Sequence, residues 1–308
     1  MNLSDIKTVG VVGGGTMGFG IALNFALGGF KTLINDVNDE ALEGTRRETE
    51  KALGLFVEED LVTRDQATEA LGRMTLTTDL ETLAAQSDFV TEAIVERLTD
   101  KQTLFKKLDE ACPPHTLLVS NTSGFVLTDI GADVQRQDKI GLTHYFAPPH
   151  IVPGVEVAKG PGTSDETYEL ICALMEKAGR IPIRLLKEKP GYLLNRIQGA
   201  AGREAARLWA EGMATAEDIE LGVRTTFGFR MPHEGPFMHH DLAGIWKWPA
   251  DAGAKRDVDP EDEVTEKIRA RMAERKPWFV DPEKFDEAIE KRDREYIRRL
   301  KALYPKDG

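Results

Sequence analysis

The chain has 308 residues, enough for two domains with buried cores, and its 41% hydrophobic and 30% charged residues are typical of a soluble globular protein. Its net charge of −12, without a dense block of Lys and Arg, argues against a nucleic-acid partner. Two cysteines, Cys112 and Cys172, are too few for a disulfide framework or a structural zinc site. They are compatible with a reducing compartment, so we expect a cytoplasmic protein.

The stretch from Val9 to Phe30 lacks charged residues and is long enough to span a bilayer. Eight glycines and Asn24 interrupt it, and no basic segment precedes it. A buried strand, a glycine turn and a buried helix explain it better than a membrane span. We therefore expect no association with a membrane.

Short apolar runs and helical patterns alternate along the first part of the chain. The predicted strands are Thr8–Val12, Lys31–Asn35, Phe89–Glu92, Leu117–Ser120, Ile140–Thr143, Gly154–Val157 and Ile181–Arg184. The predicted helices are Met17–Leu27, a long polar helix with Asn38 as its N-cap, Thr99–Ala111 and Asp165–Ala178. This alternation predicts an α/β fold of the Rossmann type, with a doubly wound, mostly parallel sheet.

The pattern changes after Lys187, where Lys189-Pro190-Gly191 signals a turn. Beyond it the periodicity is helical. Leu193, Ile197, Ala201 and Ala205 recur on one face of an expected helix. We therefore expect a Rossmann domain over residues 1–187 and an all-α domain over residues 188–308.

A glycine turn after the first strand predicts a dinucleotide site. Gly13, Gly15 and Gly18 have the G-x-G-x-x-G spacing, with Thr16 and Met17 between them, and they open a helix. The glycines permit a tight turn, close approach of a pyrophosphate, and close packing of helix on sheet. Asp36 follows at the end of the second strand, where a carboxylate accepts from ribose hydroxyls and favours NAD over NADP. The alternative is a purely structural turn.

His144 and Glu156 are the candidate acid–base pair. His144 ends a predicted strand, where ligands bind in doubly wound sheets. Glu156 lies between two valines of another strand, an unusual place for a carboxylate without a partner. A carboxylate on one imidazole nitrogen leaves the other as a general base for alcohol oxidation. A structural His and an edge-strand Glu would fit these two residues equally well.

Five segments favour the catalytic interpretation of His144 and Glu156. Their sequence, order and spacing resemble the L-3-hydroxyacyl-CoA dehydrogenase family over nearly the whole chain up to about residue 245. They are GGGTMGFGIA, TEAIVERLTDKQTLFKKLD, SNTSG, HYFAPPHIVPGVEV and PGYLLNRI. The resemblance implies that His144 and Glu156 carry the acid–base work. It also implies NAD as cofactor and a helical second domain that forms a homodimer.

The same resemblance implies roles for polar residues around the pair. Ser123 and Asn195 are expected to hydrogen-bond the substrate oxygen or nearby cofactor atoms. Glu96 and Lys101 fall on positions that contact the ribose on the nicotinamide side, and Asn121 precedes Ser123 in the cofactor-binding segment. The implied reaction is hydride transfer from an L-3-hydroxyacyl-CoA or a small 3-hydroxy acid to NAD.

Three departures from the family concern the substrate. Ala147 replaces the asparagine of the H-F-x-N-P motif, and His150 is a candidate to supply the missing polar contact. The segment around Arg230 is longer than in acyl-CoA members and is similar to the free-acid branch of carnitine dehydrogenase and lambda-crystallin. Arg230 could hold a substrate carboxylate there, or could lie in a surface loop. The family's usual C-terminal G-K-G-F-Y ending is absent.

His233, His239 and His240 could line a polar pocket, but their spacing matches no zinc motif and hydride transfer needs no metal. We therefore expect no metal. Two alternatives remain open: a dehydrogenase of free hydroxy acids, and a non-catalytic NAD-binding protein of the crystallin kind.

Overall fold

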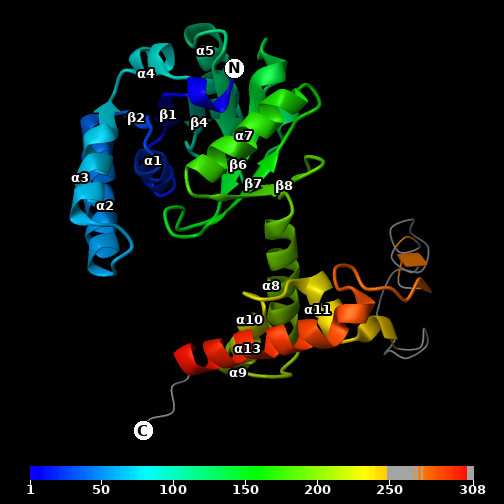
Figure 1. Ribbon diagram of the computed structural model, residues 1–308. Helices are drawn as coiled ribbons and strands as arrows, with labels where there is room; N and C mark the ends of the chain where they lie inside the picture. Colours follow the sequence, from blue (N-terminus) through cyan, green and yellow to red (C-terminus); the bar gives the residue numbers. More distant parts are fainter. Residues whose placement is uncertain (248–266, 268–269, 272, 304–308) are drawn as a thin grey trace. The chain divides into compact units, whose positions relative to one another are not determined.

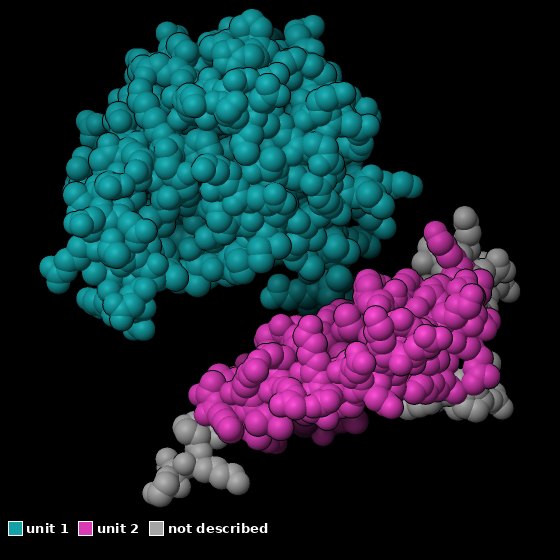
Figure 2. Space-filling model, viewed as in Figure 1, with its two compact units in different colours: residues 1–201 teal, residues 202–308 magenta. Residues whose placement is uncertain are grey.

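The computed structural model describes residues 1–247, 267, 270–271 and 273–303, and the chain forms two compact units. Unit 1 is Met1–Ala201 and unit 2 is Gly202–Gly308 (Figure 2). The predicted domain boundary near residue 187 marks the end of the strands, whereas the units divide within the helix that follows. Residues 248–266, 268–269, 272 and 304–308 of the predicted helical domain lie outside the described residues.

Unit 1 is built on an eight-stranded sheet with the order β3-β2-β1-β4-β5-β6-β7-β8 (Figure 1). The first six strands run parallel, β7 is antiparallel to β6, and β8 is parallel to β7. The predicted Rossmann-type, mostly parallel sheet is therefore confirmed. The strands are β1 Thr8–Val12, β2 Lys31–Asn35, β3 Met74–Thr77, β4 Phe89–Glu92, β5 Leu117–Ser120, β6 Ile140–Tyr145, β7 Gly154–Ala158 and β8 Ile181–Arg184.

Strand order decides where a ligand can bind in this sheet. The chain winds outward from β1 to β3 and then returns to β4, which pairs with the other edge of β1. The loops after β1 and β4 therefore leave in opposite directions and open a crevice at the carboxyl ends of both strands. The glycine turn lies in the first of these loops.

Helices cover the sheet. In unit 1 they are α1 Gly18–Leu27, α2 Asp39–Glu58, α3 Arg64–Arg73, α4 Leu80–Gln86, α5 Leu98–Ala111, α6 Leu127–Ile130, α7 Asp165–Lys177 and the start of α8 Leu194–Ala210. The predicted N-cap of α2 is confirmed, because Asn38 accepts from the backbone N–H of Ala41 at 2.8 Å. The strand β3 and the helices α3, α4 and α6 were not predicted from the sequence.

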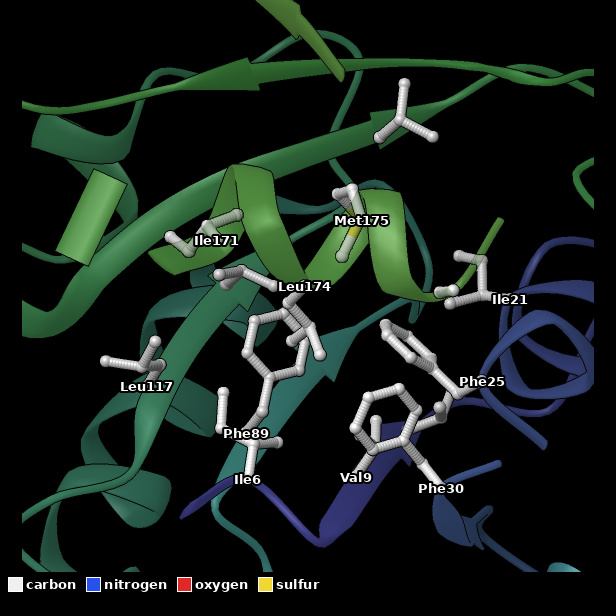
Figure 3. Packing of buried hydrophobic residues seen from close by; sticks show 14 of the residues in the cluster. Ile6, Val9, Ile21, Phe25, Phe30, Phe89, Leu117, Ile171, Leu174 and Met175 are labelled. Carbon is white, nitrogen blue, oxygen red and sulfur yellow. The ribbon is translucent and has the colours of Figure 1, made fainter. Parts of the chain in front are cut away.

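The core of unit 1 explains why its first apolar stretch is not a membrane span. All five residues of β1 are buried, as are nine of the ten residues of α1. Phe25 of α1 packs against Phe30 and Phe89, with ring centroids 6.1 and 5.7 Å apart, and α7 lies over the same cluster (Figure 3). In the described part of the chain, no helix has the length and apolarity needed to cross a membrane.

Unit 2 is helical in its described residues, as predicted for this region. It contains the rest of α8, α9 Ala216–Thr225, α10 Phe227–Arg230, α11 Pro236–Leu242 and α13 Phe285–Leu303. The buried carboxylate of Asp241 in α11 links two parts of unit 2 that are distant in sequence. It accepts from the backbone N–H groups of the segment Trp278, Phe279 and Val280. This segment stands roughly where the family's usual C-terminal ending was expected and not found.

Candidate functional site

The backbone requires glycine at two positions of the turn after β1, Gly13 and Gly18, whereas Gly15 differs from both. Gly13 has φ +94°, and a Cβ there would lie 2.6 Å from the carbonyl oxygen of Ala93. A Cβ on Gly18 would lie 1.7 Å from the carbonyl oxygen of Gly13, so only glycine lets α1 start this close to the turn. A Cβ on Gly15 would meet nothing within 4 Å. Gly15 therefore faces open space, as a position that a pyrophosphate approaches must.

Asp36 is fixed against this turn. One carboxylate oxygen accepts from the backbone N–H of Gly14 at 2.8 Å, and the other accepts from the N–H of Val37 at 2.7 Å. Thr45 of α2 donates its hydroxyl to the carbonyl of Gly14 at 3.0 Å. Asp36 thus lies beside the turn, where its carboxylate can meet ribose hydroxyls. Thr16 is exposed in the same turn.

A cavity of about 340 Å³ lies next to the glycine turn, within unit 1. Its size falls in the range typical of small-molecule sites. Ala147, at the position where the family has asparagine, is part of its lining. The lining also brings together seven of the residues that the sequence singled out: Met17, Glu96, Lys101, Asn121, Ser123, His144 and Asn195.

His144 and Glu156 form a buried pair at this cavity. They lie directly opposite each other on the antiparallel strands β6 and β7, and Nδ1 of His144 is 2.7 Å from Oε2 of Glu156. The side chains of His144 and Glu156 are 5% and 0% exposed. An ionised carboxylate only accepts, so it pairs with the tautomer that has its proton on Nδ1 and leaves the lone pair on Nε2. In that tautomer the arrangement can present the imidazole as a general base that a carboxylate orients.

The second oxygen of Glu156 connects the pair to the start of α8. Oε1 accepts from the backbone N–H groups of Leu193 and Leu194 at 3.0 and 2.7 Å. These N–H groups belong to the helix N-terminus, which favours a negative charge. One carboxylate therefore orients the imidazole and places the first turn of α8, which carries Asn195.

Two residues that the sequence analysis missed hold the segment before α8. Tyr192 is buried, packs 5.8 Å from the imidazole of His144, and donates its hydroxyl to the carbonyl of Phe125 at 2.5 Å. Burial raises the pKa of Tyr192, which keeps its hydroxyl protonated as a donor. Glu188 accepts from the backbone N–H of Leu127 at 2.7 Å. In the sequence, Tyr192 was recognised only as part of the PGYLLNRI motif. The local sequence does not indicate that Tyr192 contacts Phe125 or that Glu188 contacts Leu127.

Glu96 holds the turn that contains Ser123. Its Oε1 accepts from the backbone N–H groups of Ser123 and Gly124 at 3.1 and 2.9 Å, and its Oε2 lies 3.1 Å from Nζ of Lys101. Burial alone would raise the pKa of Glu96, but the hydrogen bonds from Thr122 and Gly124 and the Lys101 ammonium together lower it. Glu96 is therefore ionised at neutral pH.

Asn121 connects neighbouring strand ends at the cavity. Its side-chain oxygen accepts from the backbone N–H of Tyr145 at 2.9 Å, and its own backbone N–H donates to the carbonyl of Glu92 at 2.9 Å. The residue thus fixes the ends of β4, β5 and β6 relative to one another.

The two candidate substrate residues, His150 and Arg230, belong to different units. His150 is outside the cavity lining and packs between Phe19 and Phe56, with ring centroids 5.1 and 5.8 Å away. Burial and the nearby Arg180 lower the pKa of His150, so it is neutral at physiological pH. Arg230 belongs to unit 2, where its Nε lies 3.9 Å from Oε1 of Glu234.

The three histidines that were candidates to line a polar pocket, His233, His239 and His240, also lie in unit 2. Nδ1 of His239 is 2.8 Å from Oε1 of Glu234, and His233 packs edge-on against Tyr296. His240 lies 3.5 Å from Asp241. Within the described ranges, no group of three His, Cys, Asp or Glu side chains is placed to hold a metal ion.

Two family models match consecutive parts of the chain. Residues 8–189 match the NAD-binding domain of 3-hydroxyacyl-CoA dehydrogenase, and residues 191–275 match the C-terminal domain of the same family. The first match includes the glycine turn, Asp36 and the His144–Glu156 pair, and the second includes Asn195. The expected cofactor, NAD, is therefore confirmed at the level of the domain that binds it.

Known proteins agree with this assignment. A 3-hydroxyadipyl-CoA dehydrogenase of Escherichia coli is 36% identical over 78% of this chain, which spans only half of that relative's length. An L-carnitine dehydrogenase of Streptomyces coelicolor is 32% identical over 78% of this chain and 74% of its own. The crystal structure of a (S)-3-hydroxybutyryl-CoA dehydrogenase from Ralstonia eutropha matches with TM-score 0.69 and 30% identity, over 78% of this chain and 82% of that one. The chain therefore belongs to the 3-hydroxyacyl-CoA dehydrogenase family and is an NAD-dependent oxidoreductase of that type.

Proposed function

We propose that this protein oxidises the 3-hydroxyl group of an L-3-hydroxyacyl substrate, with His144 as general base. The observation that carries the proposal is the 2.7 Å contact between His144 and Glu156 at the wall of the cavity beside the glycine turn. A non-catalytic NAD-binding protein would have no need for a buried ionisable pair at this place. NAD, when bound, supplies the acceptor for the hydride that leaves the carbinol carbon.

The residues of the chain handle the proton and the oxygen. Nε2 of His144 takes the hydroxyl proton as the hydride leaves, so the imidazole becomes an imidazolium. Glu156 stabilises that charge across Nδ1. Ser123 and Asn195, which line the same cavity, hold the substrate oxygen while its bond to carbon changes from single to double.

We propose that the cofactor lies along the crevice from Asp36 to the cavity. Gly13, Gly15, Thr16, Met17 and Gly18 would hold the pyrophosphate, and Asp36 the ribose hydroxyls. Glu96 and Lys101 would contact the second ribose. The carboxylate of Asp36 repels a 2′-phosphate, so we expect NAD to be preferred to NADP.

The charges of the cavity favour a CoA ester over a free acid as substrate. Among its described lining residues, Lys101 is the one permanent cation, and it already lies within 3.1 Å of two carboxylates, Glu92 and Glu96. Among the described lining residues of unit 1, a carboxylate of a free acid would thus find no other cation, whereas a thioester carbonyl is neutral. The free-acid alternative depends on Arg230, whose guanidinium shares Glu234 with His239.

A panel of substrates tests the proposed function. NADH formation is followed by absorbance with L-3-hydroxyacyl-CoA esters and with the matching free L-3-hydroxy acids, each offered with NAD and with NADP. We expect turnover of the esters with NAD, and at least tenfold lower kcat/KM for the free acids, a difference of about 1.4 kcal/mol in transition-state binding. Faster oxidation of the free acids would reverse the substrate assignment. Failure of both classes with NAD would contradict the proposed activity.

We propose that the helical region from residue 188 onward forms a homodimer interface. More than half of the large apolar side chains that are exposed in the described residues lie from Leu193 onward, including Trp209 and Met213. The helices α8, α9 and α13 bury no residue. Apolar surface of this extent is typical of a protein contact, and a second copy of the chain is the simplest partner.

The domain boundary at residue 187 and the cytoplasmic location of the protein stay predictions.

Sedimentation equilibrium tests the dimer. We expect twice the mass of the chain for the wild type and a shift toward the monomer for Trp209→Glu, because an interfacial charge without a partner costs several kcal/mol. Exposed Val37→Glu, in the first unit, is the matched control and should leave the mass unchanged. A monomeric wild type at the working concentration would contradict the proposal.

A further inference from the structure

A buried chain of charged side chains joins the end of β4 to the turn of Ser123. Oε1 of Glu92, the last residue of β4, lies 2.6 Å from Nζ of Lys101 on α5. The same Nζ lies 3.1 Å from Oε2 of Glu96. The Glu92 and Lys101 side chains are 0% and 1% exposed. Glu92 does not line the cavity, and the proposed chemistry does not use it.

Both oxygens of Glu92 have hydrogen-bond donors. Oε1 accepts from Lys101 and from the backbone N–H of Ile94 at 2.8 Å, and Oε2 accepts from the hydroxyl of Ser120 at 2.6 Å. A buried ion pair satisfied in this way contributes little more to stability than apolar side chains of the same volume. The main contribution of the Glu92–Lys101 pair is therefore to the position of the groups that it contacts.

The first route from Glu92 to the turn passes through Lys101 and Glu96. Lys101 holds Oε2 of Glu96, so the other oxygen faces the turn. That oxygen accepts from the hydroxyl of Thr122 at 2.5 Å and from the backbone N–H groups of Ser123 and Gly124. Three donors on one oxygen fix the backbone of the turn on both sides of the Ser123 side chain.

The second route is shorter and independent of the lysine. The hydroxyl of Ser120 donates to Glu92 and, through its own lone pair, accepts from the backbone N–H of Thr122 at 3.1 Å. Ser120 and Glu92 are register partners on β5 and β4, so the strands themselves hold this contact. Both routes end on the same turn and start from the same carboxylate.

We propose that Glu92 is a positioning residue that fixes Ser123 at the cavity through both routes. The inference rests on the proposed function, in which Ser123 holds the substrate oxygen. Glu92 touches no reacting atom, so its effect on the reaction passes through Ser123. A hydroxyl displaced by about 1 Å can cost about 10²-fold in rate, because the reacting groups lose their alignment.

A double-mutant cycle in kcat tests this path. Glu92→Gln keeps the volume and one acceptor oxygen, and we expect a kcat about 10- to 100-fold below that of the wild type, with a smaller change in KM. Ser123→Ala removes the hydroxyl itself. If Glu92 acts through Ser123, the double variant is no slower than Ser123→Ala by more than about twofold. Losses that multiply in the double variant would overturn the proposal while leaving the proposed function intact.

A second readout needs no turnover. Amide hydrogen exchange of Ser123 and Gly124, in the full chain without added ligand, should become about tenfold faster in Glu92→Gln. Asp109→Asn is the matched control, because it breaks a part-buried ion pair of α5, 2.6 Å from Arg136, outside the cavity lining. It should leave exchange at both amides unchanged. Wild-type exchange in Glu92→Gln would overturn the proposal, whether or not a substrate of the enzyme has been found.

Ser120→Ala covers the case in which Glu92→Gln does not fold. It removes only the second route and leaves the ion pair intact, so no unpaired charge is buried. We expect faster exchange at Ser123 and a kcat about threefold lower, less than for the loss of both routes. Unchanged values of both would contradict a role for the second route and hence the proposal as stated.

Discussion

Replacing His144 with Gln is expected to lower kcat by about 10²- to 10⁴-fold, the usual contribution of a positioned general base. Glutamine has no group that accepts a proton at neutral pH, so the substrate hydroxyl would have to lose its proton to water. The cavity wall changes little in volume, because the amide approximates the place of Nε2, and Glu156 keeps its two backbone donors from Leu193 and Leu194. Binding of NAD should therefore persist, within about threefold of the wild-type Kd.

The measurement combines steady-state kinetics with the best CoA ester and a titration of NAD by protein fluorescence. His115→Gln is the matched control. It is the same substitution in another His–carboxylate pair, 3.1 Å from Asp88, and His115 is exposed and lies outside the cavity lining. We expect wild-type kinetics for this control. Oxidation by the His144→Gln variant at the wild-type rate would refute the proposed base.

Local patterns in the sequence were enough to predict most of the sheet. Strands such as β1 and β5 are buried along their whole length, so they read as continuous apolar runs between turn residues. The strand β3 was missed because its side chains are half-buried or exposed, and its sequence MTLT carries no such run. The position of a strand at the edge of a sheet depends on the whole fold, so it cannot be deduced from the sequence of that strand alone.

The site divides in the same way into local and distant parts. The glycine turn could be predicted because its motif is contiguous, and because the positive φ of Gly13 and the contact of Gly18 with Gly13 are local properties of the backbone. The pairing of His144 with Glu156 could only be suspected, because it requires β7 to run antiparallel to β6 in a sheet that is otherwise parallel up to that point. Glu92 was not singled out at all, since its partners Ser120 and Lys101 come from two other elements.

The apolar helical face predicted after residue 187 shows that the sequence of one chain does not determine which surface covers such a face. Leu193 and Ile197 recur with helical spacing, yet they are 44% and 47% exposed. Apolar periodicity predicts that a face will be covered, and it does not say whether the cover comes from the same chain. The homodimer proposal assigns that cover to a second copy.

Glu156→Gln is expected to reduce kcat by about 10²- to 10⁴-fold by placing the proton of His144 on the wrong nitrogen. The backbone N–H groups of Leu193 and Leu194 both point at Oε1, so the side-chain amide of the variant must turn its oxygen toward them. The NH₂ group of that amide then faces Nδ1 of His144 as a donor. Nδ1 becomes the acceptor, Nε2 carries the proton, and the imidazole can no longer accept one from the substrate.

The proton position can be observed directly. In ¹⁵N-labelled protein, we expect the Nδ1–H tautomer of His144 in the wild type and the Nε2–H tautomer in Glu156→Gln, together with a loss of about 1–3 kcal/mol in the free energy of unfolding from weaker hydrogen bonds. Glu169→Gln is the matched control, because Glu169 is an exposed carboxylate paired with Arg184, 2.6 Å away, in the same unit. It should keep the wild-type tautomer and rate. An unchanged tautomer in Glu156→Gln would show that the two backbone donors do not determine the orientation of the side-chain amide at position 156. A wild-type rate would show that Glu156 has no part in the mechanism.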